Sequence, residues 1–194
     1  MKIFIAGASG VIGARLVPLL RDAGHEVVGM TRSPAKVDLL RNLGAEPVVC
    51  DVYDASALNA AMISADPEVV IHQITDLPDD QLSISEFGRA NATIRRTGTR
   101  NLLDAARAAG AVRFIAQSVA WTIPGDGGVA VEDLERMVLD DGGVVVRYGR
   151  FYGPKTYHQN ELPPAPRIHI DEAARRTLEA LDTEASILTV VEGI

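Results

Sequence analysis

Residues 2–13 read KIFIAGASGVIG, and this stretch decides the fold. A short apolar strand at residues 3–6 runs directly into a turn with glycine at every third position. Gly7 lets the chain leave the strand tightly, Gly10 lets the backbone approach a ligand closely, and Gly13 lets the next helix pack on the sheet. The first turn of that helix offers N–H groups and the positive end of a dipole to a phosphate. We therefore predict that a dinucleotide pyrophosphate binds here, against Gly7, Ser9, Gly10, Val11, Ile12 and Gly13.

The composition is that of an ordinary globular protein. The 194 residues are 47% hydrophobic and 23% charged, which predicts one domain, residues 1–194, with a sizeable core. A net charge of -7 disfavours nucleic acid as a partner, because phosphates need a basic surface. No apolar run approaches the roughly 20 residues of a membrane span, and the N-terminal strand does not resemble a signal peptide. Together with a single cysteine, Cys50, these features predict a cytoplasmic protein with no membrane partner.

Strand-like and helix-like segments alternate along the whole chain. The expected strands are residues 3–6, 26–30, 45–50, 68–72, 112–117, 143–147 and 187–191. The expected helices are residues 11–23, 33–43, 54–62, 84–109, 131–139 and 171–181, while 75–81, 121–128 and 151–166 are expected to be irregular. This order predicts an α/β fold of Rossmann type, a doubly wound parallel sheet with helices on both faces.

The residues after the second expected strand predict which nucleotide binds. An acidic residue at this point holds the ribose 2′-hydroxyl of NAD, whereas an arginine accommodates the 2′-phosphate of NADP. The chain has no acid there but offers Arg32, and Lys36 follows one helical turn later. NADP (NADPH) is therefore favoured over NAD, and the alternative is that both cations are solvated surface charges. Asp51 and Val52, after the third strand, are expected beside the adenine; the alternative for Asp51 is an ordinary turn aspartate.

Six segments of the chain carry a resemblance to a known family. They are GASGVIG at 7–13, VVIH at 69–72, Asn91 with GTRNLLDAA at 98–106, VRFIAQS at 112–118, VRYGRFYGP at 146–154 and RIHIDEAA at 167–174. Together they resemble the extended and atypical short-chain dehydrogenases/reductases, which include the NAD(P)-dependent epimerases and dehydratases. The resemblance implies that the end of the fourth strand, with His72 and Gln73, passes beside the cofactor, and that Tyr148 meets the nicotinamide. It also implies a homodimer that pairs through the fourth and fifth helices.

The chain departs from this family at its catalytic pair, a tyrosine followed by a lysine four residues later. None of the chain's four tyrosines has a lysine at that spacing. If Glu135 aligns with the acid that often follows the lysine, Gly127 and Val131 occupy the two catalytic positions. The family's hydrogen-bonding serine is usually the second of a pair. Here the pair is Ser118-Val119, so this position is valine unless the turn is one residue shorter.

Little of the chain remains for binding a substrate. Residues 155–170 are expected to form a residual substrate-side segment, and the substrate subdomain is expected to be minimal. The candidate substrate contacts are Trp121, Tyr157 and His158. Trp121 has an alternative role, which is to cover the edge of the sheet.

Candidate proton donors are few. Ser118 and Tyr152 are the candidate catalytic residues, and the alternative for Tyr152 is a buried aromatic in the turn. His72 is expected to pack or to contact the cofactor rather than to act as a base. The four histidines show no paired spacing and Cys50 has no partner cysteine, so no metal site is expected.

The cofactor itself carries the hydride, so a chain without the tyrosine–lysine pair can still position it for reaction. The sequence therefore predicts an NADP-dependent oxidoreductase that acts on a small molecule through an atypical catalytic site. The alternative is a non-catalytic NADP-binding redox sensor or regulatory subunit, which the lost pair and the small substrate segment favour. A sugar-nucleotide epimerase or dehydratase ranks third, because its reaction needs a base that the sequence does not offer.

Overall fold

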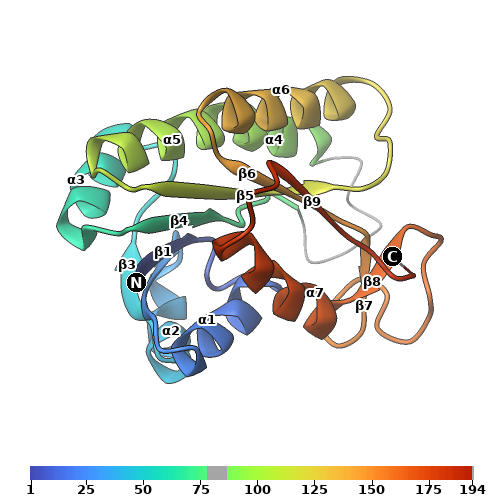
Figure 1. The fold of residues 1–194 in the computed structure, drawn as a ribbon, viewed down its shortest axis with the longest axis horizontal. Helices are drawn as coiled ribbons and strands as arrows, with labels where there is room; N and C mark the ends of the chain where they lie inside the picture. The colour runs from blue at the N-terminus through green and yellow to red at the C-terminus, as the bar shows by residue number, and fades with distance from the viewer. Residues whose placement is uncertain (78–86, 194) are drawn as a thin grey trace.

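A seven-stranded parallel sheet forms the centre of the protein in the computed structural model, which describes residues 1–77 and 87–193 (Figure 1). Its strand order within these residues is β3-β2-β1-β4-β5-β6-β9. The strands are β1 (Lys2–Ala6), β2 (Glu26–Thr31), β3 (Glu46–Val49), β4 (Val69–His72), β5 (Arg113–Val119), β6 (Val144–Tyr148) and β9 (Ile187–Val190). The order reverses direction between β1 and β4, which is the switch point at which such sheets bind ligands.

Helices cover both faces of the sheet. One face carries α1 (Gly13–Asp22), α2 (Val37–Leu43) and α7 (Ile170–Thr177). The other carries α3 (Ala55–Ala65), α4 (Gly88–Thr93), α5 (Thr99–Ala108) and α6 (Asp126–Asp140). Short turns of helix at η1 (Pro34–Lys36) and η4 (Leu178–Leu181) extend α2 and α7, and η3 (Ile94–Gly98) is a π-helical turn between α4 and α5. This arrangement confirms the predicted doubly wound, Rossmann-type fold.

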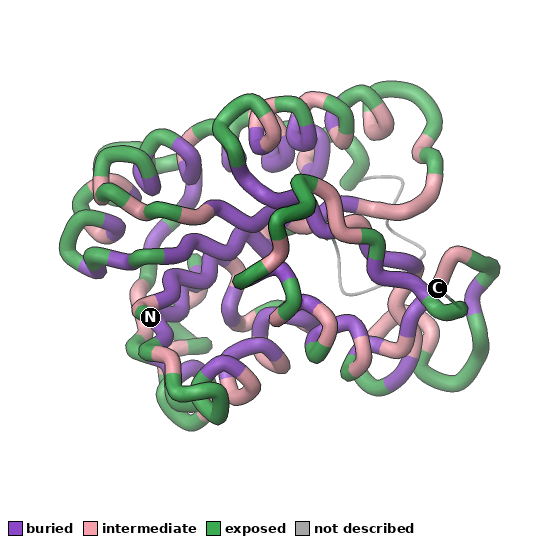
Figure 2. The backbone as a smooth tube through the Cα atoms, viewed as in Figure 1, coloured by how far each residue is buried: buried purple, intermediate pink, exposed green. Residues whose placement is uncertain are grey.

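The alternating side chains of the strands build two apolar layers. In β1, Ile3 and Ile5 pack under α1 and α7, whereas Phe4 and Ala6 pack under the helices of the opposite face. All four are fully buried, as the central strand of a sheet covered on both sides requires. Figure 2 shows this buried centre, with exposed residues on the outer faces of the helices and in the loops. No helix in the described parts of the chain is long and apolar enough to cross a membrane.

The predicted helix at 131–139 begins earlier than expected. The sequence places residues 126–128 in a loop, yet α6 begins at Asp126. Gly125 has a positive φ of 65°, and a Cβ on Gly128 would lie 2.1 Å from the carbonyl oxygen of Ile123. The glycines that suggest a loop therefore permit a tight turn directly into a helix.

Two other predicted segments differ from the structure. The long helix expected over 84–109 is divided by the π-helical turn at η3, and its first residues lie outside the described residues, as do residues 78–81 of the expected loop. The region expected to be irregular at 151–166 begins inside a short strand, β7 (Arg150–Tyr152), and ends just before another, β8 (Arg167–His169). The two strands pair in parallel beside the main sheet. Periodicity cannot detect strands of three residues, so the sequence did not indicate them.

The last residue of β4, His72, is fully buried and neutral. The backbone N–H of Ile74 donates to its Nδ1 at 3.2 Å, so its Nε2 carries the proton and donates to the Thr99 hydroxyl at 3.0 Å. Burial, and then the positive charge of Arg95, lower the pKa of His72 from 6.5 to about 4. The Nε2 contact holds the end of β4 against α5, and the Nδ1 contact closes a local turn just after β4.

The depressed pKa of His72 predicts a loss of stability in acid. Between pH 6.5 and 4 the unfolded chain binds a proton that the folded chain excludes, so the free energy of unfolding should fall by about 3 kcal/mol as the pH falls. Urea denaturation at a series of pH values measures this. His72→Gln should lack this part of the pH dependence, and the control His25→Gln should keep it. An unchanged pH dependence in His72→Gln would contradict the assignment.

Candidate functional site

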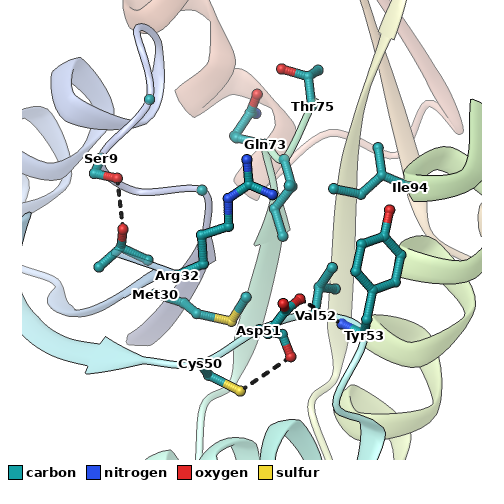
Figure 3. Close-up of a pocket in the computed structure, with 14 residues that line it drawn as sticks. Ser9, Met30, Arg32, Cys50, Asp51, Val52, Tyr53, Gln73, Thr75 and Ile94 are labelled. Carbon is teal, nitrogen blue, oxygen red and sulfur yellow. Dashed lines mark hydrogen bonds between the residues drawn. The ribbon is translucent and has the colours of Figure 1, made fainter. Parts of the chain in front are cut away.

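An open cleft lies at the carboxyl ends of β1, β2, β3 and β4, beside the switch point (Figure 3). Each of these strands delivers its last residues, or those just after it, to the cleft wall, and the π-helical turn contributes one more. The lining residues are Gly7, Ser9, Gly10, Met30, Thr31, Arg32, Cys50, Asp51, Val52, Tyr53, Gln73, Ile74, Thr75 and Ile94.

The glycine turn forms the floor of the cleft. Gly7 has a φ of +87°, and a Cβ there would lie 2.8 Å from backbone atoms of Gln73. A Cβ on Gly13 would lie 2.2 Å from the Gly7 carbonyl oxygen, so the helix start packs directly on the turn. Gly10 is exposed, and its backbone oxygen accepts from the N–H of Ala14 as the helix begins. The N–H groups of Ala14, Arg15 and Leu16 already donate to backbone oxygens of Gly10 and Ile12, so an anion would bind the N–H groups that precede Ala14.

Two predicted contacts in this turn place their side chains elsewhere. Ile12 is buried in the core and Val11 packs against it, so neither side chain lines the cleft. Only their backbone groups remain available to a phosphate. Ser9 does line the cleft, and its hydroxyl lies 3.0 Å from that of Thr31. The Ser9–Thr31 contact ties the glycine turn to the end of β2, where Thr31 also accepts from the N–H of Ser33 at 3.2 Å.

The side chain of Arg32 stands at the mouth of the cleft. It is 65% exposed and donates to the carboxylate of Asp76 at 3.1 Å. The N–H of Asp76 in turn donates to the side-chain oxygen of Asn91 at 3.2 Å. Figure 3 shows the guanidinium extending from the end of β2 toward the segment that follows β4. Lys36, the second predicted cation, is exposed in η1 and lies outside the cleft lining.

The wall beyond β3 is formed by Asp51, Val52 and Tyr53. The carboxylate of Asp51 accepts from the N–H of Tyr53 at 3.0 Å, so Asp51 closes a local turn and also faces the cleft. Burial raises the pKa of the Tyr53 hydroxyl, and Asp76 and Asp51 raise it further. Burial and the neighbouring acids Asp54 and Asp51 also raise the pKa of the Cys50 thiol. These two groups therefore stay protonated and neutral at pH 7.

The end of β4 presents a polar side chain, Gln73, in an otherwise apolar setting. Its Nε2 donates to the Tyr148 hydroxyl at 3.3 Å, and Tyr148 lies 2.6 Å from the Thr177 hydroxyl. Burial raises the pKa of Tyr148 to about 12. The side-chain oxygen of Gln73 is buried and has no hydrogen-bond partner among the described residues. A cleft with a glycine floor and an unpaired buried acceptor fits a large polar ligand such as a dinucleotide.

The hydroxyl of Ser118 is directed into a buried ionic network. It donates to Glu135 at 2.5 Å, and Arg147 donates to both oxygens of the same carboxylate at 2.9 and 2.5 Å. Burial raises the pKa of Glu135, but the hydrogen bonds from Arg147 and Ser118 outweigh it, and the net shift is downward. Ser118 lies outside the cleft lining, and the next residue, Val119, ends β5.

The other predicted catalytic residue, Tyr152, lies in β7, away from the cleft lining. Its hydroxyl donates to Glu192, and its ring packs edge-on against His169 with the centroids 5.2 Å apart. The hydrogen bond to Glu192, together with burial, raises the pKa of Tyr152. A tyrosine in this setting is a weaker acid than usual.

The predicted substrate residues gather near the β7–β8 ribbon rather than in the cleft. Trp121 lies under the guanidinium of Arg150, which is 4.6 Å from its ring centroid. Tyr157 and His158 are half-buried, and the backbone oxygen of His158 accepts from the N–H of Gly153. Within the described residues, no three histidine, cysteine, aspartate or glutamate side chains gather as a metal site.

Sequence reasoning missed seven lining residues. Six of them stand at or just after the end of a strand, where ligands bind in such sheets, so this position could have identified them. The seventh enters from the π-helical turn, which no sequence signal marked. The seven are Met30, Thr31, Cys50, Tyr53, Ile74, Thr75 and Ile94.

Comparison with known proteins agrees with this geometry. A family model described as NAD(P)H-binding matches residues 7–138. A 3-diazoavenalumate denitrifying reductase from a Streptomyces species is 32% identical over 228 aligned residues, covering 96% of this chain and 74% of that protein. The alignment is longer than the chain, so the reductase carries residues that this chain lacks. A 3-beta-hydroxysteroid dehydrogenase from Mycolicibacterium neoaurum is 29% identical over 59% of this chain and 31% of its own length.

Among solved structures, two epimerases share the fold. The UDP-glucose 4-epimerase of Thermus thermophilus, in complex with NAD, has a TM-score of 0.83 and 19% identity, covering 100% of this chain and 78% of its own. That of Thermotoga maritima, with UDP-glucose, has a TM-score of 0.80 and 19% identity over the same shares. At this identity the likeness shows the fold alone.

The ionic network predicts a structural cost for losing the Ser118 hydroxyl. Ser118→Ala removes a hydrogen bond to a buried carboxylate and should lower the free energy of unfolding by about 2 kcal/mol. Urea denaturation measures this. The control Ser64→Ala, on the exposed end of α3, should change stability by less than about 0.5 kcal/mol. Equal stabilities of the two variants would show that the contact contributes nothing.

Proposed function

Because the chain belongs to the NAD(P)H-binding family, we propose that it is an NADP-dependent oxidoreductase that reduces a small molecule with hydride from the cofactor. The observation that carries the proposal is the 32% sequence identity to a reductase across 96% of this chain. Independently of this proposal, the chain is an NAD(P)-binding protein of the reductase- and epimerase-like family.

The preference for NADP rests on Arg32. This residue follows β2, where an arginine accommodates a 2′-phosphate, and residues 30–33 at the strand end include no acid. Asp76 holds the guanidinium at the cleft mouth, and Asn91 holds Asp76. A partly preorganised guanidinium loses less side-chain freedom when a phosphate binds, which supports its role as the phosphate ligand.

Different residues of the cleft bind different parts of the cofactor. In this proposal the glycine turn binds the pyrophosphate through backbone N–H groups, and Arg32 binds the 2′-phosphate. Asp51, Val52 and Tyr53 enclose the adenine. NADPH, when bound, supplies the hydride.

The absence of the family's tyrosine–lysine proton donor limits the class of substrate that the chain can reduce. If Glu135 aligns with the acid after the family's lysine, the pair's positions are Gly127 and Val131, which lie in α6 and carry no acid. The chain has three lysines, Lys2, Lys36 and Lys155, and none lines the cleft. We therefore propose a substrate that is already electrophilic and accepts hydride without strong protonation by the protein. The relative's name describes such a compound, a diazo acid, and substrates of that kind are the first to test.

A second candidate function is a non-catalytic NADP-binding sensor or regulatory subunit. The missing pair and the short 155–170 segment favour it. The homology to a reductase over nearly the whole chain favours the enzyme. A cytoplasmic location and a homodimer remain predictions.

The decisive experiment is to titrate the protein with NADPH and NADH by fluorescence, and then to screen NADPH oxidation against diazo compounds, imines, quinones, flavins and carbonyls. Turnover of any class supports the enzyme, and tight binding without turnover supports the sensor. Where turnover is found, Ser118→Ala and Tyr152→Phe test the two candidate donors. An unchanged kcat in either variant removes that residue from the mechanism.

The nucleotide assignment predicts a selective defect. Arg32→Ala should weaken NADPH binding by about 1–3 kcal/mol, because a charged hydrogen-bonded contact is lost, and leave NADH binding nearly unchanged. Arg41→Ala is the matched control, since Arg41 is exposed on α2 and pairs with Asp38. Equal losses for NADPH and NADH would refute a 2′-phosphate contact.

A further inference from the structure

A chain of three hydrogen bonds runs through the interior from α7 to the end of β4. The Thr177 hydroxyl lies 2.7 Å from the backbone oxygen of Ala173, and the Tyr148 hydroxyl lies 2.6 Å from Thr177. The side-chain nitrogen of Gln73 lies 3.3 Å from the Tyr148 hydroxyl. Thr177, Tyr148 and Gln73 are only 1%, 2% and 5% exposed, so water does not compete for these contacts.

The direction of this chain is fixed by counting hydrogens. A backbone carbonyl only accepts, so the single hydroxyl hydrogen of Thr177 is used on Ala173. Thr177 must then accept from Tyr148, whose own single hydrogen is thereby used. Tyr148 can only accept from Gln73, which requires the amide nitrogen of Gln73 to face it. The amide oxygen is therefore held on the opposite side.

This oxygen lacks a donor. It is buried and has no hydrogen-bond partner in the described parts of the chain, and buried acceptors are rarely left unpaired in native proteins. Gln73 also lines the cleft, and its backbone touches the glycine turn. The missing donor is therefore expected on the molecule that the cleft binds.

The position of Gln73 in the sheet indicates which half of the cofactor its side chain contacts. Gln73 follows β4, whereas Arg32 and Asp51 follow β2 and β3 on the other side of β1. Dinucleotides bind across the switch point, so the adenosine half lies over β2 and β3 and the nicotinamide half over β4. The pyrophosphate offers acceptors only, which leaves the donors of the nicotinamide riboside: the carboxamide N–H and the ribose hydroxyls.

We infer that the side-chain oxygen of Gln73 accepts a hydrogen bond from an N–H or O–H donor of the nicotinamide riboside half of the cofactor. Tyr148, which the sequence placed against the nicotinamide, and Thr177 lie outside the cleft lining, so both are positioning residues that orient the amide. This inference rests on the proposed cofactor and adds a residue that specifies how its reactive half is held.

Two variants test the contact and the orientation separately. Gln73→Leu keeps the size of the side chain and should weaken NADP⁺ binding about tenfold by isothermal titration calorimetry. Thr177→Val removes the acceptor of Tyr148, which then donates to the Gln73 oxygen and turns the amide. NADP⁺ binding should weaken about fivefold although Thr177 lies outside the cleft lining. Thr177→Ser should restore it, and Gln117→Leu in β5 is the matched control.

A cofactor analogue identifies the donor. In the 3-acetylpyridine analogue of NADP⁺ a methyl group replaces the carboxamide NH₂. If the carboxamide is the donor, the wild-type protein should prefer NADP⁺ to the analogue, and Gln73→Leu and Thr177→Val should lose this preference. If a ribose hydroxyl is the donor, each variant should weaken the binding of NADP⁺ and the binding of the analogue by the same factor. Either result supports the inference.

Other results would overturn it. Wild-type affinity for both ligands in folded Gln73→Leu would mean that the oxygen binds a buried water, and wild-type affinity in Thr177→Val would remove the positioning role. Melting temperatures establish that each variant is folded. A wild-type protein that does not bind NADP⁺ or NADPH at all would refute the proposed function together with this inference. Normal wild-type binding with an unaffected Gln73→Leu refutes the inference alone.

Discussion

The close contact between the glycine turn and the end of β4 is the constraint on which the site depends. Any side chain on Gly7 would meet the backbone of Gln73, and any on Gly13 would meet Gly7 itself. Three segments, β1, α1 and the end of β4, are thereby held at backbone contact. The cleft exists because this contact leaves no side chain between the helix start and the sheet edge, so that a ligand reaches backbone groups directly.

Polar networks, rather than apolar packing, fix the remaining strand ends. His72 joins β4 to α5, Ser118 joins β5 to α6 and β6 through Glu135, and Tyr148 joins β6 to α7. Each network spans the boundary between the sheet and a covering helix. Such buried contacts are directional, and they therefore define the positions of the strand ends more narrowly than apolar contacts do. A site built on these ends is preorganised.

The sequence predicted the sheet, its helices and residues that line the cleft after β1, β2 and β3, because these follow from local patterns. Glycine spacing and strand ends identified Gly7, Arg32 and Asp51, which line the cleft as expected. It could not show that Ser118 faces Glu135, or that Arg32 is paired with Asp76, because those contacts join residues 17 and 44 positions apart. The predicted substrate residues, which came from two irregular segments, lie near the β7–β8 ribbon and outside the cleft lining.

The π-helical turn at Ile94–Gly98 sets the rotation of α5 about its own axis relative to α4. Each residue of a helix rotates the chain by about 100°, so one extra residue in a wide turn lets the two helices present independent faces. Ile94 reaches the cleft while Thr99, only five residues later, contacts His72 at the end of β4. Deleting a single residue here would keep both helices intact. It would nevertheless turn α5 by more than a quarter of a revolution, moving Leu102 out of the core and Thr99 off His72 together.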